Sequence, residues 1–160
     1  MTDRIIETLD DIDEGCAHLG AIEPRFARAR ALTGRPPLRR HGGGFPALLR
    51  AICAQQLSVA AAESVWTRLS EAGAADPQAL ARLGDEELRA CGLSRPKIRY
   101  ARALAEADLD YGALARMPEG EAVRELTAIK GIGVWTAEIY LMFAVGRADV
   151  FAPGDLALQE

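Results

Sequence analysis

The chain has 160 residues and a net charge of −4, with 49% apolar and 26% charged side chains. This composition is typical of a globular protein, and the length suits one compact domain. The apolar runs are shorter than the roughly 20 residues of a membrane span, and the acidic N-terminus lacks the apolar segment of a signal peptide. We therefore expect a soluble, intracellular protein of the cytoplasm without a membrane partner.

The sequence pattern is helical throughout. Alanine is abundant, and the alternation of apolar and polar residues that marks strands is absent, which predicts an all-α protein. Residues 33–44, with their prolines and consecutive glycines, are expected to be a loop, and Gly92 is expected to be a left-handed C-cap. Helices are expected, in chain order, at about residues 2–14, 23–32 and 45–56, after Ser58, Asp76, Asp85 and Ser94, at 111–116, from Pro118 to Ile129, and at 134–145.

The cysteines and histidines do not indicate a metal site. Cys16, Cys53 and Cys91 are widely spaced without a C-x-x-C pair, and His18 and His41 are not part of a ligand cluster. Cys53 and Cys91 lie in apolar helical segments. Buried structural thiols are therefore expected rather than a nucleophile or metal ligands.

The charge is unevenly distributed along the chain. Residues 1–23 contain seven acids and one arginine, whereas residues 24–62 contain seven arginines and no acid. Residues 88–105 contain five basic side chains and again no acid. Such basic stretches suit phosphate binding, although from charge alone a solvated helix surface is the simpler explanation.

The stretch AIKGIGVWTAEIY, residues 128–140, places Gly-Ile-Gly between two predicted helices. Glycine accepts positive φ and allows close approach of another backbone. We expect Ile132 to point inward and hold the turn rigid, while the glycine amides and the following helix N-terminus face an anion such as a DNA phosphate. A plain tight turn between two helices explains the same motif when it is taken alone.

Three longer stretches resemble a known family. Residues 126–159, LTAIKGIGVWTAEIYLMFAVGRADVFAPGDLALQ, resemble the helix-hairpin-helix and the Gly/Pro-rich loop ending in aspartate of the HhH-GPD superfamily of DNA base-excision glycosylases. Residues 44–69 and 92–107 resemble its 3-methyladenine DNA glycosylase II branch. The resemblance implies a single two-lobed helical domain over residues 1–160, with the hairpin at 126–145 and the catalytic loop at 146–155. It also implies that the family's last C-terminal helices are missing.

The resemblance assigns roles around the hairpin and the catalytic loop. Asp155 matches the catalytic aspartate, and Trp135 stands where the glycosylase-lyases have the lysine that forms a Schiff base. A monofunctional enzyme is therefore implied. The DNA backbone is expected to contact Lys130, Gly131, Ile132, Gly133 and Thr136, although Lys130 is equally readily a solvated side chain.

A flipped base leaves a gap in the duplex, which a wedge residue must fill. By its position in the family, Gln56 or its neighbour Leu57 is the expected wedge, the alternative being that Gln55 and Gln56 cap the backbone of a helix C-terminus. Trp135 and Tyr140 are expected to wall the base pocket by stacking on a cationic base. A core position is an equally good explanation of Tyr140, because apolar residues surround it at helical spacing.

The function implied is base-excision repair of alkylated DNA. A monofunctional DNA glycosylase hydrolyses the N-glycosidic bond of a flipped alkylated purine, of the 3-methyladenine type, and leaves an abasic site. Damaged double-stranded DNA is the expected partner of a monomer that needs no cofactor and lacks an iron–sulfur cluster. The resemblance also implies that the hairpin carbonyls, residues 129–133, can hold a structural Na⁺ or K⁺ ion.

Two other interpretations remain open at this point. The chain could be a non-catalytic helix-hairpin-helix DNA-binding module or inactive fragment, or a helical interaction domain that shares only the fold. The segment DVFAPGD, residues 149–155, favours the enzyme over a pure binder, because a binder has no need of an aspartate there. The basic stretches favour either DNA-binding interpretation over the interaction domain.

Overall fold

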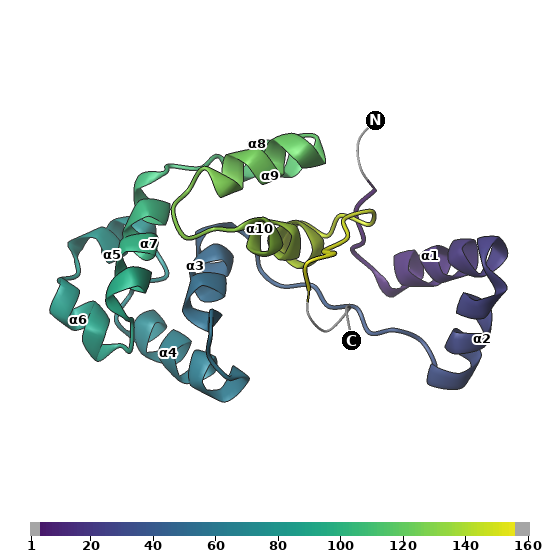
Figure 1. Ribbon diagram of the computed structural model, residues 1–160, viewed down its shortest axis with the longest axis horizontal. Helices are drawn as coiled ribbons and strands as arrows, with labels where there is room; N and C mark the ends of the chain where they lie inside the picture. The colour runs from purple at the N-terminus through teal and green to yellow at the C-terminus, as the bar shows by residue number, and fades with distance from the viewer. Residues whose placement is uncertain (1–3, 156–160) are drawn as a thin grey trace.

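The computed structural model describes residues 4–155, and short helices account for most of them (Figure 1). Within these residues the only strand-like feature is an isolated bridge between Ile5 and Arg147. The prediction of an all-α protein is confirmed. The helices are α1 Leu9–Ile22, α2 Pro24–Thr33, α3 Gly44–Ala54, α4 Val59–Glu71, α5 Pro77–Arg82, α6 Asp85–Ala90, α7 Arg95–Glu106, α8 Tyr111–Arg116, α9 Glu119–Thr127 and α10 Val134–Tyr140, which continues into the π-helix η1, Leu141–Val145.

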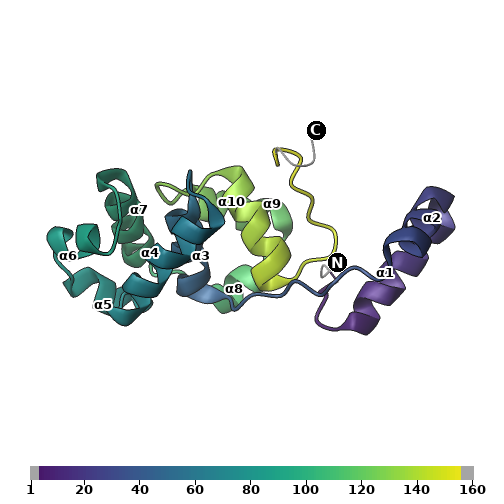
Figure 2. The same ribbon diagram turned by 90° about the horizontal axis from the view of Figure 1, so that it is seen from below.

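Helix α3 lies at the centre of the main body and contacts α4, α7 and α10 (Figure 2). Its apolar residues recur at helical spacing on one face. Leu48, Leu49, Ile52 and Cys53 are completely buried, and Phe45 is nearly so. Burial raises the pKa of the Cys53 thiol to about 12. Cys53 is therefore the structural thiol that the sequence predicts, because a nucleophilic cysteine needs a lowered pKa.

Helix α6 ends as the sequence predicts, with Gly92 in a left-handed conformation. Gly92 has φ of +104°, and its N–H donates to Arg89 O at 2.8 Å while the N–H of Leu93 donates to Leu88 O at 3.1 Å. These two bonds form a Schellman motif, which satisfies the last carbonyls of α6. Ser94 occupies the N-cap position of α7 as predicted, but its side chain does not form a capping hydrogen bond.

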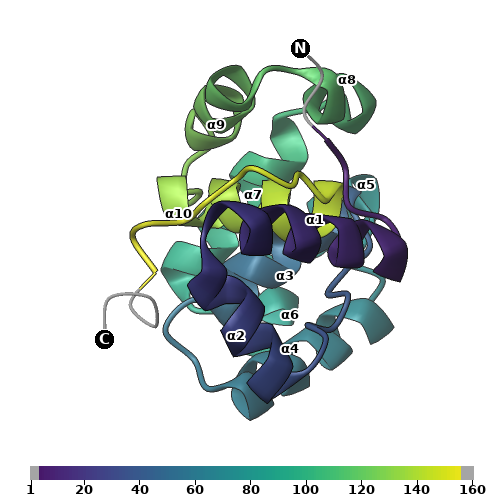
Figure 3. The same cartoon turned by 90° about the vertical axis from the view of Figure 1, so that its right-hand side faces the viewer.

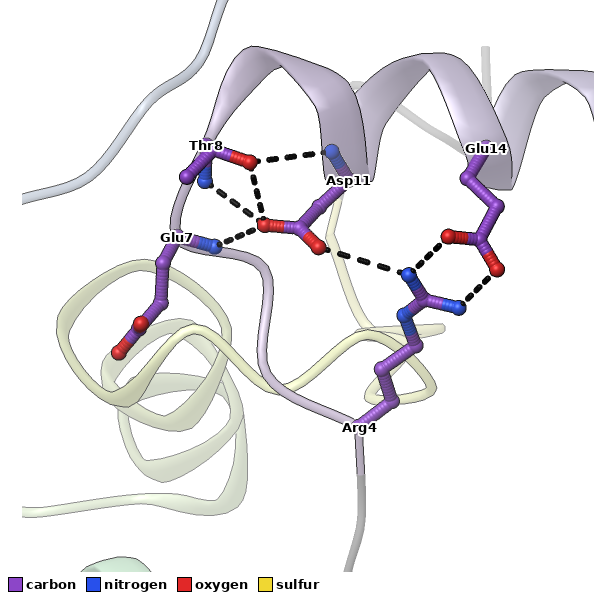
Figure 4. A network of polar contacts seen from close by, with 5 residues as sticks. All are labelled: Arg4, Glu7, Thr8, Asp11 and Glu14. Atoms are coloured by element: carbon purple, nitrogen blue, oxygen red, sulfur yellow. Dashed lines mark hydrogen bonds and ion pairs between the residues drawn. The ribbon is translucent and has the colours of Figure 1, made fainter.

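The prediction of a first helix at about residues 2–14 is wrong, because α1 begins only at Leu9. Figure 4 shows the reason: Thr8 and Asp11 form a capping box, in which Asp11 N donates to Thr8 Oγ1 at 3.2 Å and Thr8 N donates to Asp11 Oδ2 at 2.9 Å. Residues 4–6 are held in an extended conformation by the loop that follows η1. There Ile6 N donates to Gly146 O at 2.7 Å.

The helices α1 and α2 form a hairpin that stands apart from the main body, and they are the layer nearest the viewer in Figure 3. Neither helix contains a buried residue, and a groove lies between α1 and residues 148–149. Asp13 of α1 accepts hydrogen bonds of 2.6 Å from both Arg30 and Arg35. The acidic first segment thus neutralises part of the basic stretch that follows it.

The predicted helix at 134–145 has the expected bounds, but its last turn is a π-helix. Gly146 N donates to Leu141 O, five residues back. Gly146 has φ of +87°, and a methyl group there would lie 1.9 Å from the Arg40 guanidinium. Only glycine fits where the helix ends against Arg40. Among the described helices, none is long and apolar enough to cross a membrane.

We predict that the start of α1 loosens in acid. Hydrogen bonds from Thr8 lower the pKa of Asp11 from 3.8 to about 2, and Arg4 lowers the pKa of Glu14. Because the folded-state pKa of Asp11 is the lower one, its stabilising contribution is complete above about pH 4 and is lost as the pH falls towards about 2.

An NMR titration of the Asp11 carboxyl carbon and of the α1 amides measures this directly. The Asp11→Asn variant should show the loosened helix start already at pH 7, because an amide cannot accept the same set of bonds. A titration of Asp11 at its ordinary value would contradict the capping box.

Candidate functional site

The turn between α9 and α10 is held rigid by an inward-pointing isoleucine. Ile132 is only 4% exposed, and its N–H donates to Ile129 O at 3.1 Å. The prediction that Ile132 packs into the protein is confirmed. The turn therefore has an apolar anchor that fixes the main chain on either side of it.

The two glycines of the turn differ in what surrounds them. Gly131 has φ of +95°, and a methyl group on it would lie 2.2 Å from Tyr100 Cγ, so α7 packs directly against the turn. Gly133 has no atom within 4 Å of the position a methyl group would take. Gly131 is thus required by the fold, whereas Gly133 leaves an open approach to the main chain.

The N-terminus of α10 presents main-chain donors to this open side. Gly133 is its N-cap, and no side chain caps the helix. The first amides of a helix have no carbonyl partner within it, and they carry the positive end of the helix dipole. The N–H groups of Val134, Trp135 and Thr136 can therefore bind an anion.

The structure brings Trp135 and Asp155 together, although they are 20 residues apart. The indole Nε1 of Trp135 donates to Asp155 Oδ2 at 3.2 Å, and Asp155 N donates to Ala152 O at 3.0 Å. The Trp135 ring remains 44% exposed, and Asp155 is half-buried. A fixed carboxylate thus lies beside an accessible aromatic ring at the first turn of α10. The sequence also places Asp155 as the N-cap of a further helix, and residues 156–160, on which that helix would fall, lie outside the described part.

The loop between α3 and α4 carries the two residues predicted as wedges. Gln56 is exposed and has φ of +57°, the left-handed region that few residues other than glycine occupy. Leu57 is 41% exposed. Both side chains are accessible, as a wedge requires.

Comparison with known proteins assigns the chain to a family. Residues 49–160 match the family described as HhH-GPD superfamily base excision DNA repair protein. The chain belongs to this superfamily. The DNA-3-methyladenine glycosylase 1 of Schizosaccharomyces pombe is 30% identical over 94% of this chain and 67% of its own length.

Solved HhH-GPD structures share the fold closely. The crystal structure of the DNA-3-methyladenine glycosidase from Bacillus halodurans has a TM-score of 0.84 at 34% identity, covering 99% of this chain and 74% of that one. The S. pombe 3-methyladenine DNA glycosylase, solved in complex with abasic DNA, has a TM-score of 0.75 at 31% identity, covering 91% and 76%. The predicted helix-hairpin-helix glycosylase fold is confirmed.

Two predicted site residues lie deeper than a contact with DNA needs. Thr136 is 4% exposed, so its hydroxyl does not face solvent, and only its main-chain N–H is placed to meet a phosphate. Tyr140 is 5% exposed, and its hydroxyl accepts a hydrogen bond of 3.0 Å from Gly44 N. Tyr140 thus occupies the core position that was the alternative explanation. Lys130 is exposed beside the turn.

Three residues that support the site were not predicted. Gln55 Nε2 donates to Gly131 O at 2.9 Å, Lys97 Nζ donates to both Cys53 O and Gln55 O at 2.7 Å, and Tyr100 packs against Gly131. The spacing of Lys97 and Tyr100 places both on one face of α7, but nothing in the sequence shows which elements that face meets.

Of the predicted basic stretches, the one on α7 remains accessible to solvent. Arg95 and Arg99 are exposed, lie four residues apart on one face, and do not form an ion pair with any described residue. Arg50 instead pairs with Glu63 and lies over the Trp66 ring at 5.8 Å. A positive surface therefore lies on the solvent side of α7, facing away from Lys97 and Tyr100, which contact the loop and the turn.

The turn carbonyls have the chemistry for a monovalent cation. Ile129 O accepts from Ile132 N, Gly131 O from Gln55 Nε2, and Gly133 O from Ala137 N. Each carbonyl has two lone pairs, so each keeps one for a ligand, and neutral carbonyl oxygens suit K⁺ or Na⁺. By contrast, the His, Cys, Asp and Glu side chains of residues 4–155 do not gather into a metal-binding group.

The two turn glycines predict opposite mutational effects. Gly131→Ala should lower the free energy of unfolding by at least about 2 kcal/mol, because it adds backbone strain and a clash with Tyr100. Gly133→Ala should lower it by less than about 1 kcal/mol, the range for replacing an N-cap glycine. The same change should nevertheless weaken DNA binding, because its methyl group obstructs the open side.

Urea unfolding and fluorescence anisotropy with a duplex oligonucleotide measure the two effects on the same samples. Gly42→Ala is a matched control, because Gly42 has no atom near its Cβ position and lies in the loop before α3, outside both the turn and the catalytic loop. A stable Gly131→Ala protein, or Gly133→Ala with unchanged DNA binding, would contradict these assignments.

Proposed function

We propose that this chain is a monofunctional DNA glycosylase of base-excision repair, acting as a monomer on double-stranded DNA that contains damaged bases. It hydrolyses the N-glycosidic bond of a flipped alkylated purine, of the 3-methyladenine type, and leaves an abasic site. The observation that carries the proposal is the Trp135–Asp155 hydrogen bond, which holds a carboxylate beside the α10 N-terminus in a chain of the HhH-GPD superfamily. The DNA-3-methyladenine glycosylases among its relatives support the choice of substrate.

Binding to DNA begins at the phosphate backbone. The amides of Val134, Trp135 and Thr136 at the open side of the turn receive one phosphate, and the exposed Lys130 adds positive charge beside it. Main-chain donors read the backbone and not the base sequence. This mode of binding suits an enzyme that must search all sequences for damage. A Na⁺ or K⁺ ion at the turn carbonyls would stiffen the turn.

The base must leave the duplex before it reaches Asp155. Gln56, exposed at the tip of the α3–α4 loop, enters the gap, and the accessible Trp135 ring stacks on the flipped base. A purine alkylated at N3 or N7 is cationic, so it stacks favourably on an indole face. The wedge and the aromatic ring thus hold the base out of the helix and next to the carboxylate.

Cleavage of the glycosidic bond builds positive charge on the deoxyribose. The carboxylate of Asp155 stabilises this charge and orients or deprotonates the attacking water. A cationic base leaves without protonation, so no second carboxylic acid is needed. Trp135 lacks the amine that would attack C1′, and the reaction stops at the abasic site.

The decisive experiment uses the 160-residue protein and a duplex oligonucleotide containing methylated purines. Incubation followed by hot alkali should cleave the strand at the methylated purines, whereas neutral conditions should leave it intact. An unmethylated duplex is the control. Binding without abasic sites would indicate a DNA-binding module, and a covalent complex trapped by borohydride would indicate a lyase.

The role of Asp155 predicts a separation between catalysis and binding. Asp155→Asn keeps an oxygen that can accept from Trp135 but removes the charge, so base release should slow by roughly 10²–10³-fold. Binding to duplex DNA should stay equal or become slightly tighter, because a negative charge near phosphates is lost. Single-turnover base release and anisotropy measure the two.

Asp149→Asn is the matched control, since Asp149 is an exposed aspartate of the same loop. It should retain full base release. Equal activity of Asp155→Asn and the unaltered protein would sink the catalytic assignment.

A further inference from the structure

The α3–α4 loop and the turn before α10 are joined by a side chain, although they lie 76 residues apart in the sequence. Gln55 is the C-cap of α3 and is partly buried. Its Nε2 donates to Gly131 O at 2.9 Å, the carbonyl at the point where the turn reverses. The loop that carries Gln56 is thus tied to the turn that offers the main-chain donors.

A second anchor holds the same loop from α7. Lys97 Nζ donates to Cys53 O and to Gln55 O, both at 2.7 Å, and places a positive charge at the negative end of α3. One turn further along α7, Tyr100 packs against Gly131. Helix α7 therefore supports the loop through Lys97 and the turn through Tyr100, while Gln55 closes the third side.

These contacts of Gln55, Lys97 and Tyr100 explain why Gln56 has a left-handed backbone conformation. A left-handed φ of +57° is unfavourable for a residue with a side chain, and it persists only where the neighbouring structure fixes it. Gln55 is held at its carbonyl by Lys97 and at its side chain by Gly131. The chain must therefore leave Gln55 in one direction, which fixes the place of Gln56 relative to the turn.

We propose that Gln55 is a positioning residue for base extrusion. Its amide keeps the α3–α4 loop in register with the turn, so that Gln56 enters the base stack at the nucleotide whose backbone the turn holds. Gln55 acts through Gln56 and does not itself fill the gap. The identity of the substrate rests on the proposed function. The link between the α3–α4 loop and the turn rests on the hydrogen bonds described above.

A fixed register matters because extrusion is energetically demanding. Unstacking and unpairing a base requires a few kcal/mol, and the requirement is smallest where the base is already unpaired. If the wedge is not fixed relative to the phosphate contact, it contributes less to the extrusion of a paired base. A base without a pairing partner needs little help from the wedge to leave the duplex. Replacement of Gln55 should therefore slow the release of paired bases only.

The test compares Gln55→Ala and the nearly isosteric Gln55→Glu, whose carboxylate cannot donate to Gly131 O. Gln78→Ala, at an exposed glutamine of α5, is the matched control. The substrates carry 7-methylguanine either paired with cytosine or opposite a tetrahydrofuran abasic analogue. Both Gln55 variants should release the paired base about three- to tenfold more slowly, the range for one neutral hydrogen bond, and release the unpaired base at the normal rate.

A double-mutant cycle tests whether Gln55 acts through Gln56. Once Gln56→Ala has removed the wedge, adding Gln55→Ala should cause little further loss. Equal slowing on both substrates, unchanged rates in both variants, or additive effects in the cycle would overturn the proposal. Thermal unfolding of each variant identifies any that fail to fold, and in that case Gln55→Glu decides in place of Gln55→Ala.

A second readout does not depend on catalysis. A duplex with 2-aminopurine next to a tetrahydrofuran site should fluoresce more strongly when the unaltered protein or Gln78→Ala binds, because the wedge disturbs stacking there. The increase should be largely lost with either Gln55 variant at saturating protein. If the unaltered protein releases no methylated purine, the proposed function fails, but this readout still supports or overturns the role of Gln55.

Discussion

The burial of α3 is the constraint on which the rest of the structure depends. Leu48, Leu49 and Ile52 are completely buried, so α3 is surrounded by α4, α7 and α10. With α10 packed against α3, the turn before α10 lies beside the loop that leaves the end of α3. The contact of Gln55 with Gly131 follows from this arrangement. The core thus fixes the relation between the two segments that meet DNA in the proposed function.

Local chemistry could be predicted from the sequence, because its signals lie within a few residues of each other. Ile132 between two glycines indicated a rigid turn, and the structure buries it. The first helix was misplaced because its start is decided by the Thr8–Asp11 box and by the pairing of Ile6 with the distant Gly146. A long-range backbone bond of this kind leaves no mark in the local sequence pattern.

The residues of the candidate site likewise fall into those that a sequence motif identifies and those that only the structure identifies. Asp155 and Trp135 are found by motif, and the structure adds that they share a hydrogen bond. Tyr140 lies in the core and Gln55 in the loop-to-turn contact, and neither position could be chosen from the sequence. An aromatic residue at helical spacing fits a core and a pocket equally well. Only the packing of α10 on α3 distinguishes the two.

A net charge of −4 is unfavourable for association with DNA, but net charge is a poor guide where main-chain amides bind the phosphate. Asp13 neutralises Arg30 and Arg35 far from the turn. The donors proposed to meet DNA are backbone amides, which are already fixed in direction by Ile132 and need no side-chain ordering. Such a contact depends on a rigid turn more than on an excess of lysine and arginine. Gly131 against Tyr100 is therefore as much a part of DNA binding as any basic residue.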